Sequence, residues 1–139
     1  MEKLFQRKKR NSLSLFLFLV LFVTSCTNDT PSNSYTFRCT ESSRLGLRNY
    51  SVDFYKVKNS TTKYLISNFH KYSYDGEYDI TADITGDKIE ITPKDFNAEV
   101  RIMSGNGTVN ADFTEIKIDY IVQNSIRNET IEYTVIFSR

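Results

Sequence analysis

Residues 77–92 read "EYDITADITGDKIEIT", and the alternation in this stretch decides the fold class. Apolar and polar residues alternate up to Thr85, Gly86 and Asp87 interrupt the pattern, and the alternation then resumes. The alternating apolar residues are Tyr78, Ile80, Ala82, Ile84, Ile89 and Ile91. A period of two is typical of a half-buried strand, and a two-residue interruption is typical of a hairpin turn. The stretch therefore predicts a β-hairpin with one buried and one solvated face.

The same period of two runs through the rest of the chain from Tyr35 onward. Similar runs are "YTFRCTE", "YSVDFYKVKN", "KYLISNF", "AEVRIM", "GTVNADF", "TEIKIDYIVQ" and "TIEYTVIF". No stretch has the pattern of a convincing amphipathic helix. Because closure removes exposed strand edges, we expect an all-β, antiparallel up-and-down meander that closes into a small barrel of about eight strands. The candidate core residues are Phe54, Ile80, Ile84, Ile89, Ile91, Ile116, Ile118, Val135 and Phe137.

The N-terminus has the order of charges and apolar residues of a secretory signal peptide. Five basic residues precede an apolar run from Leu13 to Val23, and small residues then lead to Cys26. As a helix, that run would be roughly half as long as a hydrocarbon core of about 30 Å. An uncleaved membrane anchor is therefore the weaker interpretation, and residues 1–25 are predicted to be a signal peptide.

The sequence "VTSC", residues 23–26, resembles the lipobox of bacterial lipoproteins, although that family most often has Leu where Val23 stands. The resemblance implies that Cys26 becomes the first residue and carries a diacylglycerol thioether. Two or three acyl chains hold a protein to a membrane durably, whereas one chain does so only marginally. Thr27 after the cysteine implies the outer membrane, and Asp29 leaves the periplasmic and surface faces both open. The alternative is an ordinary secretory signal followed by a free cysteine.

Removing residues 1–25 from 139 leaves 114, a usual size for one domain. Residues 26–34 are expected to form the lipidated cysteine and a flexible tether, and residues 35–139 the barrel. The leader holds five of the 18 Lys and Arg and one of the 17 Asp and Glu, which leaves 13 against 16, or about −3. A mildly acidic chain without clustered Lys and Arg does not predict a nucleic-acid surface.

The order of the strand-like segments resembles small Bacteroidetes-type lipoproteins with a lipocalin-like, calycin-type barrel. The resemblance covers nearly all of residues 35–139 and rests on "VDFYKV", "KYLISNFH", "YDITADITGDKIEITPKDF", "GNGTVN", "IKIDYIV" and "YTVIFSR". Members often pair a cysteine of the last strand with one of the first, but "IEYTVIF" has none. Cys39 is then the only thiol of the domain, and no disulfide is expected.

Few residues are candidates for chemistry. His70 is the sole histidine, which excludes a His-based metal cluster, and its neighbours predict an exposed, solvated loop. We place Cys39 on the strand face opposite Phe37 and expect a buried or half-buried, inert thiol, because no histidine is near it in sequence. No catalytic residue, metal site or cofactor is predicted.

Two further motifs have simple structural interpretations. The stretch "SGNGT", residues 104–108, lacks the lysine and helix of a phosphate-binding loop, so a strand bulge or bend is expected. The four Asn-x-Ser/Thr sequons within residues 35–139 are explained by Asn-rich turns without sugar. They begin at Asn49, Asn59, Asn106 and Asn128.

Three tyrosines crowd into "HKYSYDGEY": Tyr72, Tyr74 and Tyr78 are candidate contacts for a partner or a ligand. The alternative is that tyrosine is simply a good strand residue with one polar end. We expect a non-catalytic binding or interaction module. The open alternatives are small apolar-ligand binding inside the barrel, and an inhibitor or assembly subunit that contacts another envelope protein.

Overall fold

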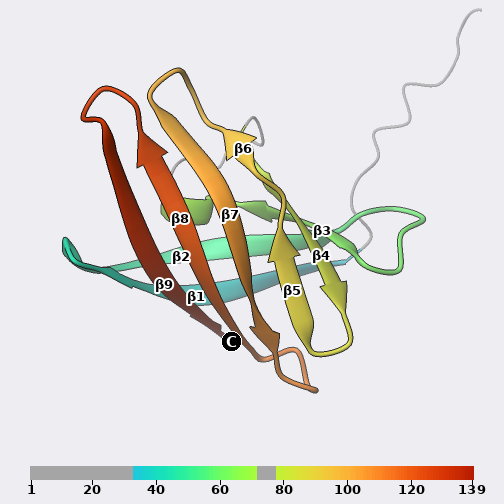
Figure 1. Ribbon diagram of the computed structural model, residues 1–139. Helices are drawn as coiled ribbons and strands as arrows, with labels where there is room; N and C mark the ends of the chain where they lie inside the picture. The colour runs from blue at the N-terminus through green and yellow to red at the C-terminus, as the bar shows by residue number, and fades with distance from the viewer. Residues whose placement is uncertain (1–32, 72–77) are drawn as a thin grey trace, which may run out of the picture.

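The computed structural model describes residues 33–71 and 78–139, which form a closed antiparallel β-barrel (Figure 1). The elements are β1 (Ser34–Ser43), β2 (Gly46–Lys56), β3 (Lys63–Ser67), the 3₁₀ turn η1 (Phe69–Lys71), β4 (Ile80–Thr85), β5 (Lys88–Ile91), β6 (Lys94–Asp95), β7 (Val100–Val109), β8 (Glu115–Asn124) and β9 (Glu129–Ser138). The sheet order is β5-β4-β3-β2-β1-β9-β8-β7-β6, and an additional β5–β7 pairing closes eight of the strands into a ring. Apart from the two-residue β6, which pairs only with β7, successive strands of the ring are neighbours and β1 pairs with β9, so the expected up-and-down meander is confirmed.

The hairpin of residues 77–92 is present as β4 and β5. Ile84 pairs with Ile89 and Ala82 with Ile91, and Gly86 takes a positive φ of 63° in the two-residue turn. Of the predicted core residues, all are buried except Ile84, which is partly buried against the core. The alternation therefore predicted both the hairpin and its inward face correctly.

Strand β7 contains the predicted irregularity. Its register against β8 shifts between Ile102 and Ser104, which is the bulge expected for the "SGNGT" stretch. A Cβ at Gly107 would overlap the carbonyl oxygen of Lys117, and one at Gly105 would lie 3.0 Å from side-chain atoms of Ile91 and Tyr120. The two glycines thus let β7 approach β5 and β8 closely where the barrel closes.

Aromatic rings fill the barrel interior from several walls. Phe54 of β2 and Phe137 of β9 have ring centroids 5.4 Å apart, and Phe69 of η1 lies 6.1 Å from Phe137. Phe113, in the β7–β8 connection, packs 5.1 Å from Tyr35 and 6.2 Å from Phe54. Phe69 and Phe113 therefore act as plugs near opposite ends of the barrel.

Different segments of the chain form the two ends of the barrel, which we call the entry end and the distal end. The entry end contains the start of β1 and the end of β9, together with the β4–β5 turn and the β7–β8 connection (Figure 1). The distal end contains the β1–β2 turn, the β8–β9 turn and η1. The chain therefore enters the barrel at one end and carries η1 at the other.

No helix in residues 33–71 and 78–139 is long and apolar enough to cross a membrane.

Candidate functional site

A cluster of polar side chains lies inside the distal end of the barrel, and we call it the Glu41 cluster. Its members are Glu41 of β1, Arg48 and Tyr50 of β2, His70 of η1, Tyr120 of β8 and Tyr133 of β9. Glu41 is only 1% exposed because it follows Phe37 and Cys39 at every second position of β1 and faces inward with them. A buried carboxylate is costly unless it is paired, so the contacts of Glu41 decide what the cluster does.

Both carboxylate oxygens of Glu41 accept hydrogen bonds. Arg48 Nη2 donates to Oε1, and this ion pair joins adjacent strands. Tyr50 donates to Oε2 at 2.7 Å, and the hydroxyl of Tyr120 on β8, two strands from β1, donates to the same oxygen. His70 Nδ1 lies 3.2 Å from Oε2. The carboxylate is thus surrounded by four side chains from three different elements, β2, η1 and β8.

His70 is buried, so the expectation of an exposed loop histidine is wrong. Its side chain is 10% exposed, Nδ1 lies 2.6 Å from Tyr120 Oη, and its ring stands edge-on to Tyr133 at 4.7 Å. The physical reason is a backbone turn with positive φ at Asn68 and His70 as well as at Lys71. That turn directs the ring of Phe69 and the imidazole together into the barrel, where burial of the apolar ring is favourable.

The electrostatics of the cluster favour a fixed charge at Glu41. Burial alone would raise the pKa of Glu41, but the hydrogen bonds and charge of His70 and the hydroxyls of Tyr120 and Tyr50 outweigh it and lower this pKa to about 2. Burial, and then the negative charge of Glu41, raise the pKa of Tyr50 and of Tyr120. Glu41 therefore stays ionised and both phenols stay protonated at neutral pH.

The cluster reaches solvent through Arg48. Its side chain is 39% exposed, and its guanidinium lies 5.4 Å from the ring centroid of Tyr133. Tyr133 in turn stacks on Tyr120 with ring planes 17° apart. A charged group and two stacked rings are therefore held rigidly beneath the distal surface.

Cys39 is buried as expected, but its assigned face is wrong. Residues two apart in a strand share a face, so Cys39 and Phe37 both point into the barrel, at 1% and 0% exposure. Burial, only partly offset by a hydrogen bond with Tyr50, raises the pKa of the Cys39 thiol to about 12. The thiol is therefore protonated and inaccessible, which agrees with the expectation of an inert cysteine.

The tyrosines singled out in the sequence fall into two groups. Tyr78 is partly buried, and its ring lies 6.1 Å from that of Phe96, so it packs against the core of the distal end. Tyr72 and Tyr74 lie outside the described residues, as does Cys26. His70 and Tyr78 nevertheless place both ends of the 70–78 segment at the distal end.

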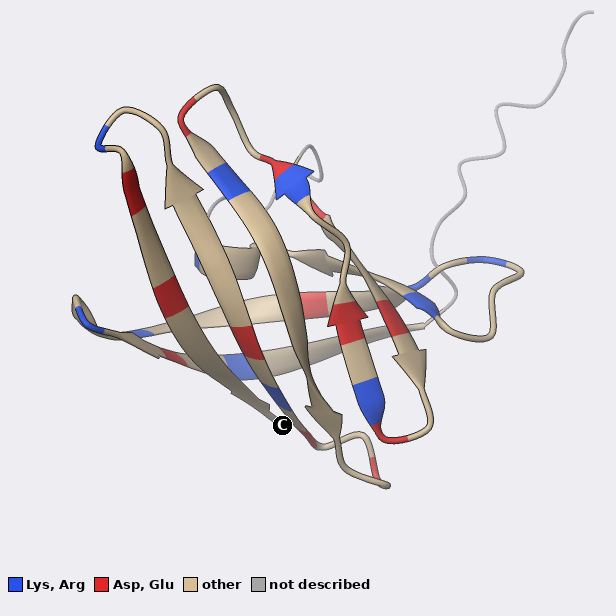
Figure 2. Cartoon of the chain, viewed as in Figure 1, with Lys and Arg blue, Asp and Glu red and all other residues tan. Residues whose placement is uncertain are grey.

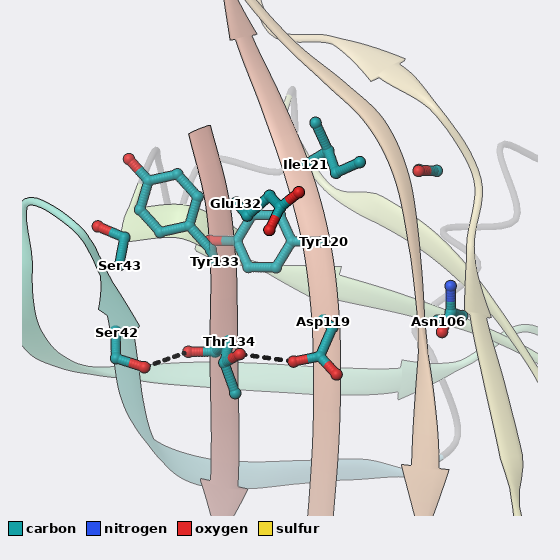
Figure 3. A pocket seen from close by; sticks show the side chains of 10 residues that line it. Ser42, Ser43, Asn106, Asp119, Tyr120, Ile121, Glu132, Tyr133 and Thr134 are labelled. Carbon is teal, nitrogen blue, oxygen red and sulfur yellow. Dashed lines mark hydrogen bonds between the residues drawn. The ribbon is translucent and has the colours of Figure 1, made fainter. Parts of the chain in front are cut away.

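A depression of about 470 Å³ lies on the outer wall formed by β1, β9, β8 and β7 (Figure 3). Asp119 accepts a hydrogen bond from Thr134 Oγ1 at 2.5 Å, and Ser42 Oγ donates to the Thr134 carbonyl at 3.3 Å. These groups hydrogen-bond to one another across β1, β9 and β8. These polar groups of the depression are therefore partnered within the wall, and its chemistry does not select a ligand.

Sequence reasoning missed the Glu41 cluster although one signal for it was present. The alternation "FRCTE" puts Glu41 in phase with Phe37 and Cys39, and a charge in phase with core residues indicates a buried, paired group. Within the described ranges, no three His, Cys, Asp or Glu residues lie close enough together to hold a metal ion. The cluster's chemistry is therefore that of arginine, carboxylate and phenol.

Comparisons with protein-family models, curated proteins and solved structures find no match to this chain.

Proposed function

We propose that the chain is a lipoprotein of a bacterial envelope, anchored in the outer membrane through Cys26, and that its barrel is a non-catalytic binding or interaction module. The observation that supports this proposal is that the tether and the candidate contact segment lie at opposite ends of the barrel. The tether would reach the barrel at the entry end, where Asn33 and Ser34 lie, while His70 and Tyr78 flank the candidate contact segment at the distal end. An anchored barrel can therefore present its distal end away from the membrane.

The chemistry of the Glu41 cluster supports binding over catalysis. A general base needs a pKa near the working pH and a free lone pair aimed at a substrate. Glu41 has a pKa lowered to about 2, and both its oxygens already accept hydrogen bonds from Arg48, Tyr50 and Tyr120. The cluster is better suited to stiffening the distal end than to transferring protons.

The packing of the interior favours a protein partner over a small apolar ligand. A ligand-binding barrel needs an open cavity, whereas here Phe54 and Phe137 pack together in the interior and Phe69 and Phe113 plug it. In the view of Figure 2, acidic and basic residues are interspersed along the strands, which favours no nucleic-acid surface. An inhibitor or assembly subunit of another envelope protein is therefore the preferred partner class, and ligand binding within the barrel is the second candidate.

The anchor is tested by labelling cells with a clickable fatty acid. The full chain should carry the label and fractionate with membranes, and Cys26→Ala should lose both properties because the thiol is the acceptor. Label that persists on Cys26→Ala would contradict the lipoprotein assignment.

The contact segment is tested by recovery of a partner from solubilised envelope. The double variant Tyr72→Ala/Tyr74→Ala should recover less partner than the original chain while its melting temperature stays close to the original value. Tyr55→Ala, at a partly exposed tyrosine of β2 outside the contact segment, is the matched control and should recover partner normally. Equal recovery by all three proteins would remove the 70–78 segment from the proposed site.

A further inference from the structure

Part of β2 has a neighbouring strand on one side only. β1 pairs with β2 from Gly46 to Tyr55, whereas β3 pairs only with residues 53–56. Beyond β3 the side chain of Asn68 donates to the Ser51 carbonyl at 2.8 Å, and the chain then turns into the barrel at η1. Residues 46–50 of β2, next to the β1–β2 turn, therefore form a strand edge that β3 does not cover, and we call them the open edge.

The direction of the backbone groups in the open edge follows from its register. Ser43 and Gly46 close the two-residue hairpin, so the backbone groups of Gly46 and Arg48 point toward β1 and those of Leu47 and Asn49 point away from it. The Ser51 carbonyl, in phase with Leu47 and Asn49, indeed points toward Asn68. Within the described part of the chain, the backbone N–H and C=O groups of Leu47 and Asn49 have no hydrogen-bond partner.

Exposed apolar side chains at and beside the open edge favour its association with another strand. Leu47 is 71% exposed and Leu45, in the turn, is 63% exposed. Natural sheets usually protect such an edge with proline, a bulge or inward-pointing charge. Residues 46–50 contain no proline, and their pairing with β1 has no register shift. The one charge among them, Arg48, points inward but is paired with Glu41.

We propose that two copies of this chain pair through the open edge, with their β2 strands antiparallel about a two-fold axis at Leu47. An antiparallel strand edge is self-complementary, because each outward N–H of one copy meets an outward C=O of the other. Leu47 then exchanges two backbone hydrogen bonds with Leu47 of the second copy. Asn49 N–H donates to the carbonyl of Leu45 of the second copy.

Two alternative registers, centred on Asn49 and on Arg48, are less favourable than the register centred on Leu47. A register centred on Asn49 places the second copy beside Ser51, whose carbonyl already accepts from Asn68. A register centred on Arg48 sets two guanidinium groups opposite each other, which is destabilising. The register centred on Leu47 places Arg48 opposite Gly46 of the second copy and brings the two exposed Leu47 side chains together.

The paired surface is small. It buries less than the roughly 1,000 Å² that a stable interface usually needs, so the two copies exchange rapidly instead of forming a permanent dimer. The pairing uses only described residues and does not depend on the lipid anchor. The test must therefore trap the pair in place and not rely on affinity.

The experiment is disulfide trapping of the full chain with Leu47→Cys under mild oxidant. A hydrogen-bonded antiparallel pair has Cα atoms about 5.5 Å apart, within the range of a disulfide. Ile126→Cys is the matched control, since Ile126 is 69% exposed on the neighbouring hairpin, which the Arg44–Glu129 ion pair ties to the β1–β2 turn. Leu47→Cys should give a cross-linked dimer, Ile126→Cys should give little, and the unmodified chain supplies the background from Cys26 and Cys39.

Adding Asn49→Pro to Leu47→Cys should abolish the dimer, because proline removes an outward N–H and spares the ladder with β1. If this variant melts at a lower temperature, Leu47→Glu replaces it. Two carboxylates would then face each other on the axis, and glutaraldehyde cross-linking of two differently tagged copies, seen with the original chain, should be lost. Equal cross-linking at Leu47 and Ile126, a dimer that survives the proline or the glutamate, or a Leu47→Cys adduct with a different protein would each overturn the proposal.

Discussion

His70 Nδ1 lies 2.6 Å from the hydroxyl of Tyr120, so η1 at the distal end is bonded to the wall opposite β3. The same hydroxyl donates to Glu41 of β1, which joins a third element to this contact. Because the two side chains meet over a buried carboxylate, the distal end depends on an ionised Glu41.

Glu41→Gln should lower the free energy of unfolding by about 2–3 kcal/mol. The amide keeps the shape of the side chain but removes the charge, which leaves Arg48 without a buried counter-ion; losses of this kind run to a few kcal/mol, and the partial exposure of Arg48 keeps this one moderate. The measurement is urea unfolding at neutral pH. Glu129→Gln is the matched control, because its ion pair with the exposed Arg44 should contribute less than about 1 kcal/mol. Equal losses for the two variants would contradict a special role for Glu41.

The second prediction is that stability falls in acid through Glu41. Its pKa is lowered from 4.5 to about 2 in the folded chain, so the folded state binds this proton more weakly than the unfolded state does. The resulting stabilisation is fully present above pH 4.5 and is lost as the pH falls toward 2. Urea unfolding of the original chain and of Glu41→Gln over that range should therefore converge as the pH decreases. A difference that stays constant with pH would show that Glu41 does not titrate in this way.

The alternation of the sequence was enough to predict the meander, the β4–β5 hairpin and most of the core, because strand period and turn chemistry are local properties. The bulge of β7 was predictable for the same reason, from Gly105 and Gly107. The position of His70 was not, because left-handed φ values at non-glycine residues have no reliable sequence signal. The partners of Glu41 come from β2, β8 and η1, and only the closed barrel with its inward turn at η1 brings them together.

Cys39 should resist thiol reagents in the folded chain. It is 1% exposed, so a reagent cannot reach the sulfur, and burial raises its pKa to about 12, so the reactive thiolate is not formed at neutral pH. In a Cys26→Ala background, which leaves Cys39 as the single thiol, maleimide labelling should proceed only at the rate of unfolding and become rapid in urea. Reductant and chelator should leave the melting temperature unchanged, because folding is expected to need neither a disulfide nor a metal. Rapid labelling without denaturant, or a fall in melting temperature with either reagent, would contradict this account.

Gly107→Ala should be among the most damaging single substitutions in the barrel. The added methyl group would overlap the backbone carbonyl of Lys117, and a backbone atom cannot rotate away as a side chain can. β7 must then separate from β8 or from β5, where Gly107 pairs with Ile118 and Ile89 and the ring closes. We expect a loss of at least about 3 kcal/mol in urea unfolding, at the high end for overpacking. Ser104→Ala, at an exposed position of the same strand, is the matched control and should stay within about 0.5 kcal/mol. A Gly107→Ala variant as stable as Ser104→Ala would mean that β7 and β8 do not approach each other closely at this point, and that the barrel closes in a different register.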